Sequence, residues 1–256
     1  MNSDINSGTP IIPRATIYMR NRYELIRGEG IARQFFRGKE NLIRHTMSAP
    51  GARWSLIASG GERSFIHGVK LPEPFPKMMN IWRIENWDTL YKSMYTYGDA
   101  GWFDSLVKTL LSEDQDLLVD LGAYPTTPRG PWPDDRSADR VYLYEEVLLN
   151  PDATGHAFLR NFCWFASQVE TYGWRLTWNA QQITSAPSAL CALWSVPTVD
   201  RMNDTLERMA NETPYAHRYA KMMGQIATLS RQVLCPSWVE RLDDRIRAGQ
   251  PAPIVP

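Results

Sequence analysis

The sequence predicts an α+β fold in which a βαββαβ unit occurs twice along the chain. Residues 80–90 are echoed by residues 192–202, so that Trp82 matches Trp194, and the echo continues downstream at the same spacing. Upstream of each copy lies a further matching feature, a glycine that ends a helical pattern and begins a strand: Gly51 in the first copy and Gly173 in the second. Two copies of one supersecondary unit bury their apolar faces against each other, so the repeat predicts the architecture before any side-chain chemistry is considered.

The first copy shows the periodicities of four strands and two helices. Alternating apolar and polar residues indicate strands, and apolar residues three and four apart indicate helices. A long irregular segment, residues 60–78, separates the two central strands. The expected order is a strand over 15–27, a helix over 31–47, strands over 52–59 and 79–85, a broken helix over 87–97 and 102–111, and a strand over 117–121.

The second copy repeats this order after a proline-rich linker, which can continue neither sheet. Its expected elements are a strand over 140–149, a helix over 154–172, strands over 174–182 and 190–196, a helix in two parts over 199–209 and 215–227, and a strand over 231–234. The chain then divides into a disordered N-terminus (1–13), a first repeat (14–124), the linker (125–138), a second repeat (139–236) and a C-terminal helix and tail (237–256). We expect the terminal helix to be solvated and separate from both repeats.

The composition limits the classes of function. The chain has 256 residues, 43% of them hydrophobic, and its 28 basic residues balance 28 acidic ones. A chain without net charge has no field that attracts nucleic acid or an anionic membrane. Three cysteines without metal-ligand spacing fit a reducing compartment, and no signal peptide or membrane-spanning stretch is apparent. We expect a cytoplasmic protein that binds neither nucleic acid nor membrane and that can form a homo-oligomer.

A βαββαβ unit has the ferredoxin-like topology, whose sheet carries helices on one face and needs a cover on the other. The tandem copy supplies that cover. The chain therefore resembles the dimeric α+β barrel superfamily in its fused, pseudo-dimeric form. Within it the likeness is to the NIPSNAP-like branch, through Arg-Tyr-Glu-Leu at 22–25 and the Asn-Ile-Trp strand at 80–82 that leads into an aromatic-rich helix.

The segment 60–78 is the first place to look for a grafted function, because the second copy has only a short connection there. His67 is a candidate for proton transfer, since imidazole titrates near neutral pH. Glu73 lies between two prolines and is a candidate base, and Arg53 could bind a substrate carboxylate. The alternative interpretations are that His67 is simply exposed to solvent, that Glu73 keeps the proline-rich segment soluble, and that Arg53 forms a structural ion pair. The order arginine, histidine, carboxylate is also similar in residue type to bacterial Pictet–Spengler-type cyclases.

Aromatic residues form a second candidate group. Ten tryptophans are many for this length, and the matched Trp82 and Trp194 are expected in the core. The residues predicted to contact a flat aromatic substrate are Trp54, Trp87, Tyr91 and Tyr97, with an aromatic-rich core as the alternative.

The first strands of the two copies align so that Arg22 matches Glu146. Strand parity places Arg20, Arg22, Glu24 and Glu146 on the polar face, where the symmetry of the fold would bring opposite charges together in the barrel interior. We interpret these residues first as a structural pairing and only second as catalytic.

No cofactor and no metal are expected, because the sequence contains no Gly-rich phosphate loop, no HExxH and no nucleophile elbow. Some tandem relatives in the superfamily bind haem through a helical histidine of the second half. That resemblance makes His156 and His217 the candidates here, and haem is kept as an alternative because a single axial ligand leaves no spacing to test.

The sequence thus favours a cofactor-independent enzyme of specialised small-molecule metabolism with an aromatic substrate. Acid/base chemistry in a pocket of the first repeat would drive cyclisation, condensation, isomerisation or oxygenation. The alternatives are a haem-binding enzyme of the same superfamily and a non-catalytic ligand-binding or scaffold barrel.

Overall fold

The computed structural model describes residues 16–48, 54–62, 77–98, 101–130, 141–184 and 189–251. The first half contains β1 (Ile17–Leu25), α1 (Ile31–Ser48), β2 (Trp54–Glu62), β3 (Lys77–Ile84), α2 (Trp87–Gly98), α3 (Gly101–Val107) and β4 (Leu110–Asp120). The second half contains β5 (Val141–Leu149), α4 (Gly155–Glu170), β6 (Arg175–Gln182), β7 (Leu190–Val196), α5 (Val199–Asn211), α6 (Thr213–Met223) and β8 (Ile226–Pro236), followed by α7 (Trp238–Arg247).

The eight strands form one closed antiparallel barrel in the order β1-β3-β2-β8-β5-β7-β6-β4. Each half contributes four adjacent strands, and the halves join at two seams, β2 with β8 and β4 with β6. Each seam pairs only a short stretch of the two strands, Gly60–Glu62 with Leu234–Pro236 and Leu118–Asp120 with Ala180–Gln182. The mixed α+β architecture predicted from the sequence is therefore present, with the expected alternation of elements in each half.

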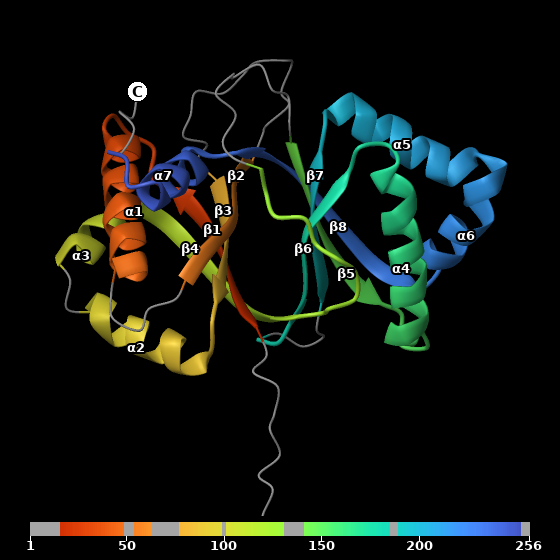
Figure 1. The fold of residues 1–256 in the computed structure, drawn as a ribbon, viewed down its shortest axis with the longest axis horizontal. Helices are drawn as coiled ribbons and strands as arrows, with labels where there is room; N and C mark the ends of the chain where they lie inside the picture. The colour runs from red at the N-terminus through yellow and green to blue at the C-terminus, as the bar shows by residue number, and fades with distance from the viewer. Residues whose placement is uncertain are drawn as a thin grey trace, which may run out of the picture.

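The helices cover the outside of the barrel in two groups. Helices α1, α2, α3 and α7 lie over the strands of the first half, and α4, α5 and α6 lie over those of the second (Figure 1). Buried apolar side chains accordingly form a core under each helical layer and a third core inside the barrel. No helix in the described part of the chain combines the length and apolarity needed to cross a membrane.

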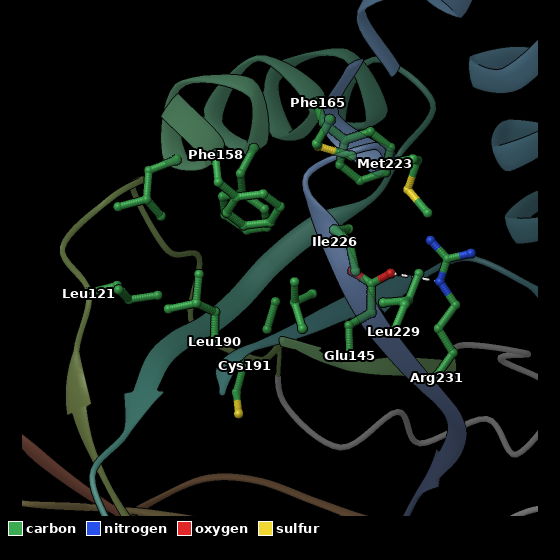
Figure 2. A pocket seen from close by; sticks show the side chains of 15 residues that line it. Leu121, Glu145, Phe158, Phe165, Leu190, Cys191, Met223, Ile226, Leu229 and Arg231 are labelled. Carbon is green, nitrogen blue, oxygen red and sulfur yellow. Dashed lines mark hydrogen bonds and ion pairs between the residues drawn. The ribbon is translucent and has the colours of Figure 1, made fainter. Parts of the chain in front are cut away.

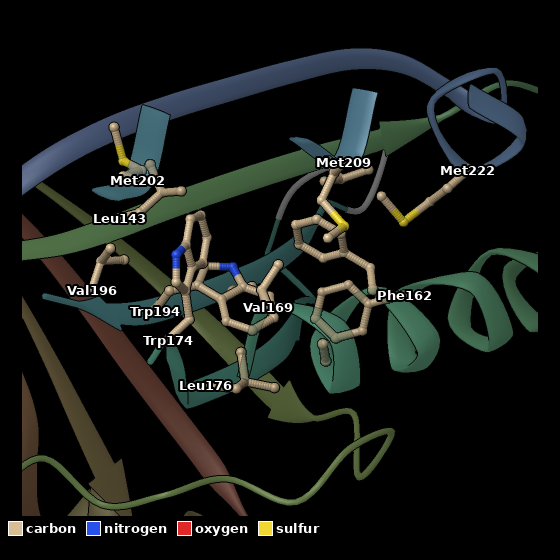
Figure 3. Close-up of a cluster of buried hydrophobic side chains, with 14 of the residues drawn as sticks. Leu143, Phe162, Val169, Trp174, Leu176, Trp194, Val196, Met202, Met209 and Met222 are labelled. Atoms are coloured by element: carbon tan, nitrogen blue, oxygen red, sulfur yellow. The ribbon is translucent and has the colours of Figure 1, made fainter. Parts of the chain in front are cut away.

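The second-half core is densely aromatic. Trp174 and Trp194 lie with ring centroids 5.8 Å apart, and Phe162 is 5.6 Å from Trp194 (Figure 3). Both Trp194 and Trp82, its match in the first half, are buried, which confirms their prediction as core residues. Edge-to-face aromatic contacts of this kind add about 0.5–1.5 kcal/mol each beyond the burial of area.

Strand β4 is longer than the sequence predicts. The expected helix through residue 111 ends at Val107, and the strand begins at Leu110 rather than at residue 117. The polar run 112–116 was not included in the expected strand, but it pairs with β1 along its whole length and places Asp114 opposite Arg22 and Asp116 opposite Arg20. Charge pairing across the ladder stabilises a strand that apolar periodicity does not reveal.

Helix α7 also differs from expectation. It was predicted to be solvated, yet Trp238, Val239 and Leu242 are buried in the first-half core, where the helix packs on α1 and β2. Because most residues of this helix are charged, its apolar stripe was not recognised in the sequence. The Ser237 side chain caps the helix by accepting a hydrogen bond from the Val239 amide.

Candidate active site

A cavity of about 230 Å³ lies in the first half, between the outer face of the sheet and the helices that cover it. Its wall is mainly apolar, with a few polar groups on one side. The apolar residues include Met19, Leu42, Trp54, Trp82, Leu90, Phe103 and Leu106, and the polar ones are Asn21, Tyr23, Lys39, Glu113 and Gln115. A concave apolar site with a few convergent polar groups is the usual form of a small-molecule site.

Lys39 is the most unusual group in this wall. Its side chain is only 1% exposed, and its Nζ donates a hydrogen bond to Tyr23 Oη at 2.8 Å. Nζ also lies 4.0 Å from the ring centroid of Tyr23 and 5.4 Å from that of Phe35. Desolvation lowers the pKa of Lys39 from 10.5 to about 7, against a smaller opposing effect of the Glu113 charge. A large fraction of the amine is therefore neutral at pH 7.

Tyr23 and Glu113 complete the polar side of the cavity. Burial, assisted by the charge of Glu113, raises the pKa of Tyr23 well above its ordinary value, so its phenol keeps its proton at neutral pH. Glu113 lies at the exposed edge, where its Oε1 accepts hydrogen bonds from Asn21 Nδ2 at 3.1 Å and Gln115 Nε2 at 2.7 Å. The groups thus run from a buried amine and phenol to a carboxylate in contact with water.

Local sequence explains how these side chains meet. Successive residues of a strand point to opposite faces, so β1 directs Asn21 and Tyr23 outward to the cavity and Arg20 and Arg22 into the barrel. In α1, Lys39 lies four residues after Phe35, on the helix face that packs against the sheet.

Trp54, predicted to bind substrate, forms part of the cavity wall. Its indole Nε1 donates to Ser93 Oγ at 2.9 Å, and its ring lies 6.3 Å from that of Trp82. The hydrogen bond between β2 and α2 holds the indole in place, which leaves a rigid apolar surface facing the cavity.

The other predicted site residues either lie outside the described part of the chain or are exposed away from this cavity. Arg53, His67 and Glu73 lie outside the described residues. On α2, Trp87 and Tyr91 are 52% and 61% exposed and do not line the cavity. Tyr97 lies in the same helix, and its side chain is outside the described residues.

The second half has only a small cavity in the comparable region, of about 30 Å³. Phenylalanines of α4, including Phe158 and Phe165, fill the space above the sheet (Figure 2). An ion pair joins Arg231 Nε to Glu145 Oε1 at 2.8 Å, and Glu145 Oε2 accepts a hydrogen bond from Trp194 at 2.8 Å. The polar groups of this cavity thus contact one another.

This region does not fit a haem. At about 30 Å³ the cavity is several times smaller than the roughly 150 Å³ cavity that holds benzene, and the candidate ligands His156 and His217 are exposed and line no part of it. Cys191 borders the cavity, but its sulfur points to the opposite face of the sheet (Figure 2), and burial raises the pKa of its thiol. Nor does the part of the chain described by the structure contain a group of three or more metal-ligating side chains.

The barrel interior contains the ion pairs that strand parity predicts. Arg20 contacts Asp116 and Glu146, and Arg22 contacts the same Glu146. Burial raises the pKa of Asp116, but Arg20 and hydrogen bonds from Gln182 and other neighbours more than offset this, so the pKa lies below its usual value. Both halves contribute to this buried network, which supports the structural interpretation of Arg20, Arg22 and Glu146.

Sequence analysis missed Lys39, although its position carries a signal. Phe35, Lys39 and Ile43 recur every four residues, and both flanking residues are fully buried. A lysine on the apolar stripe of a helix must either extend to water or lose its charge. Glu113 was missed for another reason. The last strand of the first half was expected over 117–121, so that Glu113 was placed in the connection before it, whereas β4 begins at Leu110.

Comparisons with known proteins bear on the class of fold. No family model matches the chain, and no curated protein matches it. Solved structures with the same fold are dimeric α+β barrel proteins, so the architecture inferred from the sequence agrees with that of known proteins. The NIPSNAP-like and Pictet–Spengler-type likenesses receive no support from them and stay predictions.

Three of these structures illustrate the range. A putative monooxygenase from Lactobacillus acidophilus NCFM gives a TM-score of 0.54 at 12% identity, over 86% of this chain and 93% of that one. An anthrone oxidase-like protein gives 0.54 at 8% identity, over 87% and 91%. Chlorite dismutase from Candidatus Nitrospira defluvii, in complex with imidazole, gives 0.52 at 6% identity, over 90% and 94%. At these identities the likeness shows the fold alone.

Proposed function

We propose that the chain is an enzyme that uses Lys39 as a general acid/base on a small, largely apolar molecule bound in the first-half cavity. The observation that carries the proposal is a buried lysine, with its pKa lowered to about 7, in the wall of a cavity. General acid/base catalysis works best when the pKa of the catalytic group is close to the working pH. Groups with strongly perturbed pKa values in clefts are candidates for function on that ground.

The dimensions of the cavity restrict its ligand. A cavity of 150 Å³ lined by apolar residues accommodates benzene, so about 230 Å³ suits one substituted ring. Trp54 and Trp82 supply flat apolar surfaces, while Lys39 and Tyr23 meet a polar substituent at one side. The prediction of a small aromatic partner is thereby narrowed to a single-ring compound.

Proton abstraction is the step that this arrangement supports. A neutral Lys39 amine can accept a proton from a weakly acidic O–H or C–H of the bound molecule, and the Tyr23 phenol can hydrogen-bond the oxygen that becomes negative. Support for an enzyme also comes from the putative monooxygenase and the anthrone oxidase-like protein that share the fold. Cyclisation has no comparable support, and we infer proton transfer without assigning it to ring closure.

Two earlier predictions remain part of the proposal. We infer that the halves are tandem ferredoxin-like repeats, because both show strand, helix, two strands, helices and strand in the same order. His67 and Glu73 remain candidates for a second acid/base group, and His67→Ala and Glu73→Gln are expected to lower turnover if that group is needed. A carrier without chemistry is the rival function for the same cavity.

A chromogenic phenol separates an acid/base site from a passive carrier. We choose 4-nitrophenol, a single-ring acid whose phenolate absorbs visible light. At a pH where the free probe is mostly protonated, wild-type protein should hold the bound probe as phenolate, because the phenolate forms an ion pair with protonated Lys39. Lys39→Met should bind the probe as the neutral phenol, and the exposed-lysine control Lys108→Met should behave as wild type. Equal protonation of the bound probe in wild type and Lys39→Met would favour the carrier.

A further inference from the structure

We propose that Lys39 forms an imine with a single-ring aromatic aldehyde or ketone held in the first-half cavity. The inference rests on the proposed function, because it uses the same cavity and the same neutral amine, and it names the substrate class as a carbonyl compound. Lys39 Nζ has a fixed position here, over the rings of Tyr23 and Phe35 and within hydrogen-bond distance of the Tyr23 phenol.

Other nucleophiles in the described residues are poorer candidates for covalent chemistry. Lys77, Lys92, Lys108 and Lys221 are exposed and line no part of the first-half cavity. Burial raises the pKa of the thiols of Cys163 and Cys191, so both favour the unreactive protonated form. Lys39 is the amine that combines burial, a cavity and a hydroxyl neighbour.

The step balances without an oxidant or reductant. The Nζ lone pair attacks the carbonyl carbon, the C=O π electrons move to oxygen, and one amine proton is transferred to that oxygen to give a carbinolamine. The hydroxyl then leaves as water after taking a proton, while the nitrogen lone pair forms the C=N bond and the second amine proton is lost. Amine plus aldehyde therefore gives imine plus water.

Two residues of the cavity suit the proton transfers of this sequence. The Tyr23 phenol lies 2.8 Å from Nζ and is kept protonated, so it can donate to the carbonyl oxygen and to the departing hydroxyl. Glu113 is exposed at the cavity edge and can exchange the released protons with water. Trp54 and Trp82 would hold the ring beside the amine.

Reductive trapping with benzaldehyde tests the inference. The full chain is incubated at pH 7 with benzaldehyde and cyanoborohydride, digested, and each lysine peptide and the N-terminal peptide are quantified by mass spectrometry. At this pH about half of Lys39 is neutral, against roughly one in 3,000 for an exposed lysine. We expect Lys39 to gain one benzyl group about a thousandfold faster than Lys77 or Lys108. The N-terminal amine, which is also partly neutral, is separated from it by the peptide map.

Two variants and a ligand without a carbonyl complete the design. Tyr23→Phe retains the ring beside the amine but removes the phenol, and it should slow trapping at Lys39 by at least tenfold when benzaldehyde is saturating, a condition that removes any effect of weaker binding. Lys39→Met should bind benzyl alcohol and show no benzyl group in its 39-containing peptide. Binding is followed by the change in tryptophan fluorescence, to which Trp54 and Trp82 in the cavity wall contribute.

The outcomes separate the inference from the function on which it rests. If benzyl alcohol and benzaldehyde bind, and Lys39 is labelled no faster than the exposed lysines, the imine proposal is wrong while an acid/base site can stand. If neither compound binds, both proposals fail. Selective labelling that is equally fast in Tyr23→Phe would support the imine and overturn the role assigned to the phenol.

Discussion

Replacing Lys39 with methionine should stabilise the protein at neutral pH. The lysine is fully enclosed, and burial lowers its pKa from 10.5 to about 7. At about 1.4 kcal/mol per pKa unit, folding at pH 7 loses roughly 4 kcal/mol through this one group. The variant also loses the hydrogen bond to Tyr23, worth about 1 kcal/mol. The expected net gain in the free energy of unfolding is therefore roughly 3 kcal/mol.

The pH dependence of this gain identifies its cause. Between pH 10.5 and 7 the unfolded chain binds a proton that the folded chain does not, so wild type loses stability as the pH falls through that window. Below pH 7 both states are protonated and the loss is constant, and above pH 10.5 neither is, so the loss disappears. The advantage of the Lys39→Met variant should accordingly shrink as the pH rises from 7 to 10.5.

Urea unfolding of wild type and variant at several pH values measures the difference directly. Lys108→Met is the matched control, because this lysine is exposed and its replacement should change stability by no more than about 0.5 kcal/mol. A stability difference between wild type and Lys39→Met that does not vary with pH would refute the reasoning. It would mean that Lys39 keeps its proton when buried.

Three other substitutions test the cavity, the barrel interior and the seam between the halves. Leu42→Phe should fill the first-half cavity and lower the affinity for benzyl alcohol at least tenfold by titration fluorescence, with little loss of stability. Arg20→Met leaves the buried Asp116 carboxylate without its cation, while Glu146 keeps Arg22, and should lower the unfolding free energy by about 3–5 kcal/mol in urea. Gly60→Ala places a Cβ 2.7 Å from Leu234 Cβ at the β2–β8 seam and should lower the unfolding free energy by about 1–3 kcal/mol. In the control Gly155→Ala the new Cβ meets no atom, and the unfolding free energy should fall by less than about 0.5 kcal/mol in the same assay. Equal losses in the two variants would refute the close approach of Gly60 to Leu234.

Periodicity allowed the order of elements to be predicted because the strands and helices of each half bury one regular face. It also predicted the Arg22–Glu146 pair, since matching positions of two similar strands face each other across a closed barrel. The start of β4 was wrong because residues 112–116 are polar on both faces, one facing the ion pairs of the interior and the other facing water and the cavity edge. Such a strand depends on partners that only the tertiary structure supplies.

The candidate site was predictable only in part for a related reason. The sequence predicted a pocket between sheet and helices of the first half, with Trp54 among its residues, and the structure has a cavity there. It did not predict Lys39, because composition treats lysine as a solvated residue, while its burial depends on how α1 packs against β1 and α3. The candidates His67 and Glu73 were chosen because the segment 60–78 is long in the first copy and short in the second. That difference in length gives no information about the side chains that lie between the helices and the sheet.

The contrast between the halves is the strongest argument that Lys39 serves a function. In α4, Phe162 lies four residues after Phe158, as Lys39 lies four residues after Phe35 in α1, and both pairs pack on the sheet. The phenylalanine fills its side of the molecule and leaves about 30 Å³, whereas the lysine borders about 230 Å³ and destabilises folding at neutral pH. A buried polar group that costs stability is expected where activity requires it. If Lys39→Met were more stable than wild type and kept full activity, the loss of stability caused by Lys39 could not be explained by a requirement of the activity.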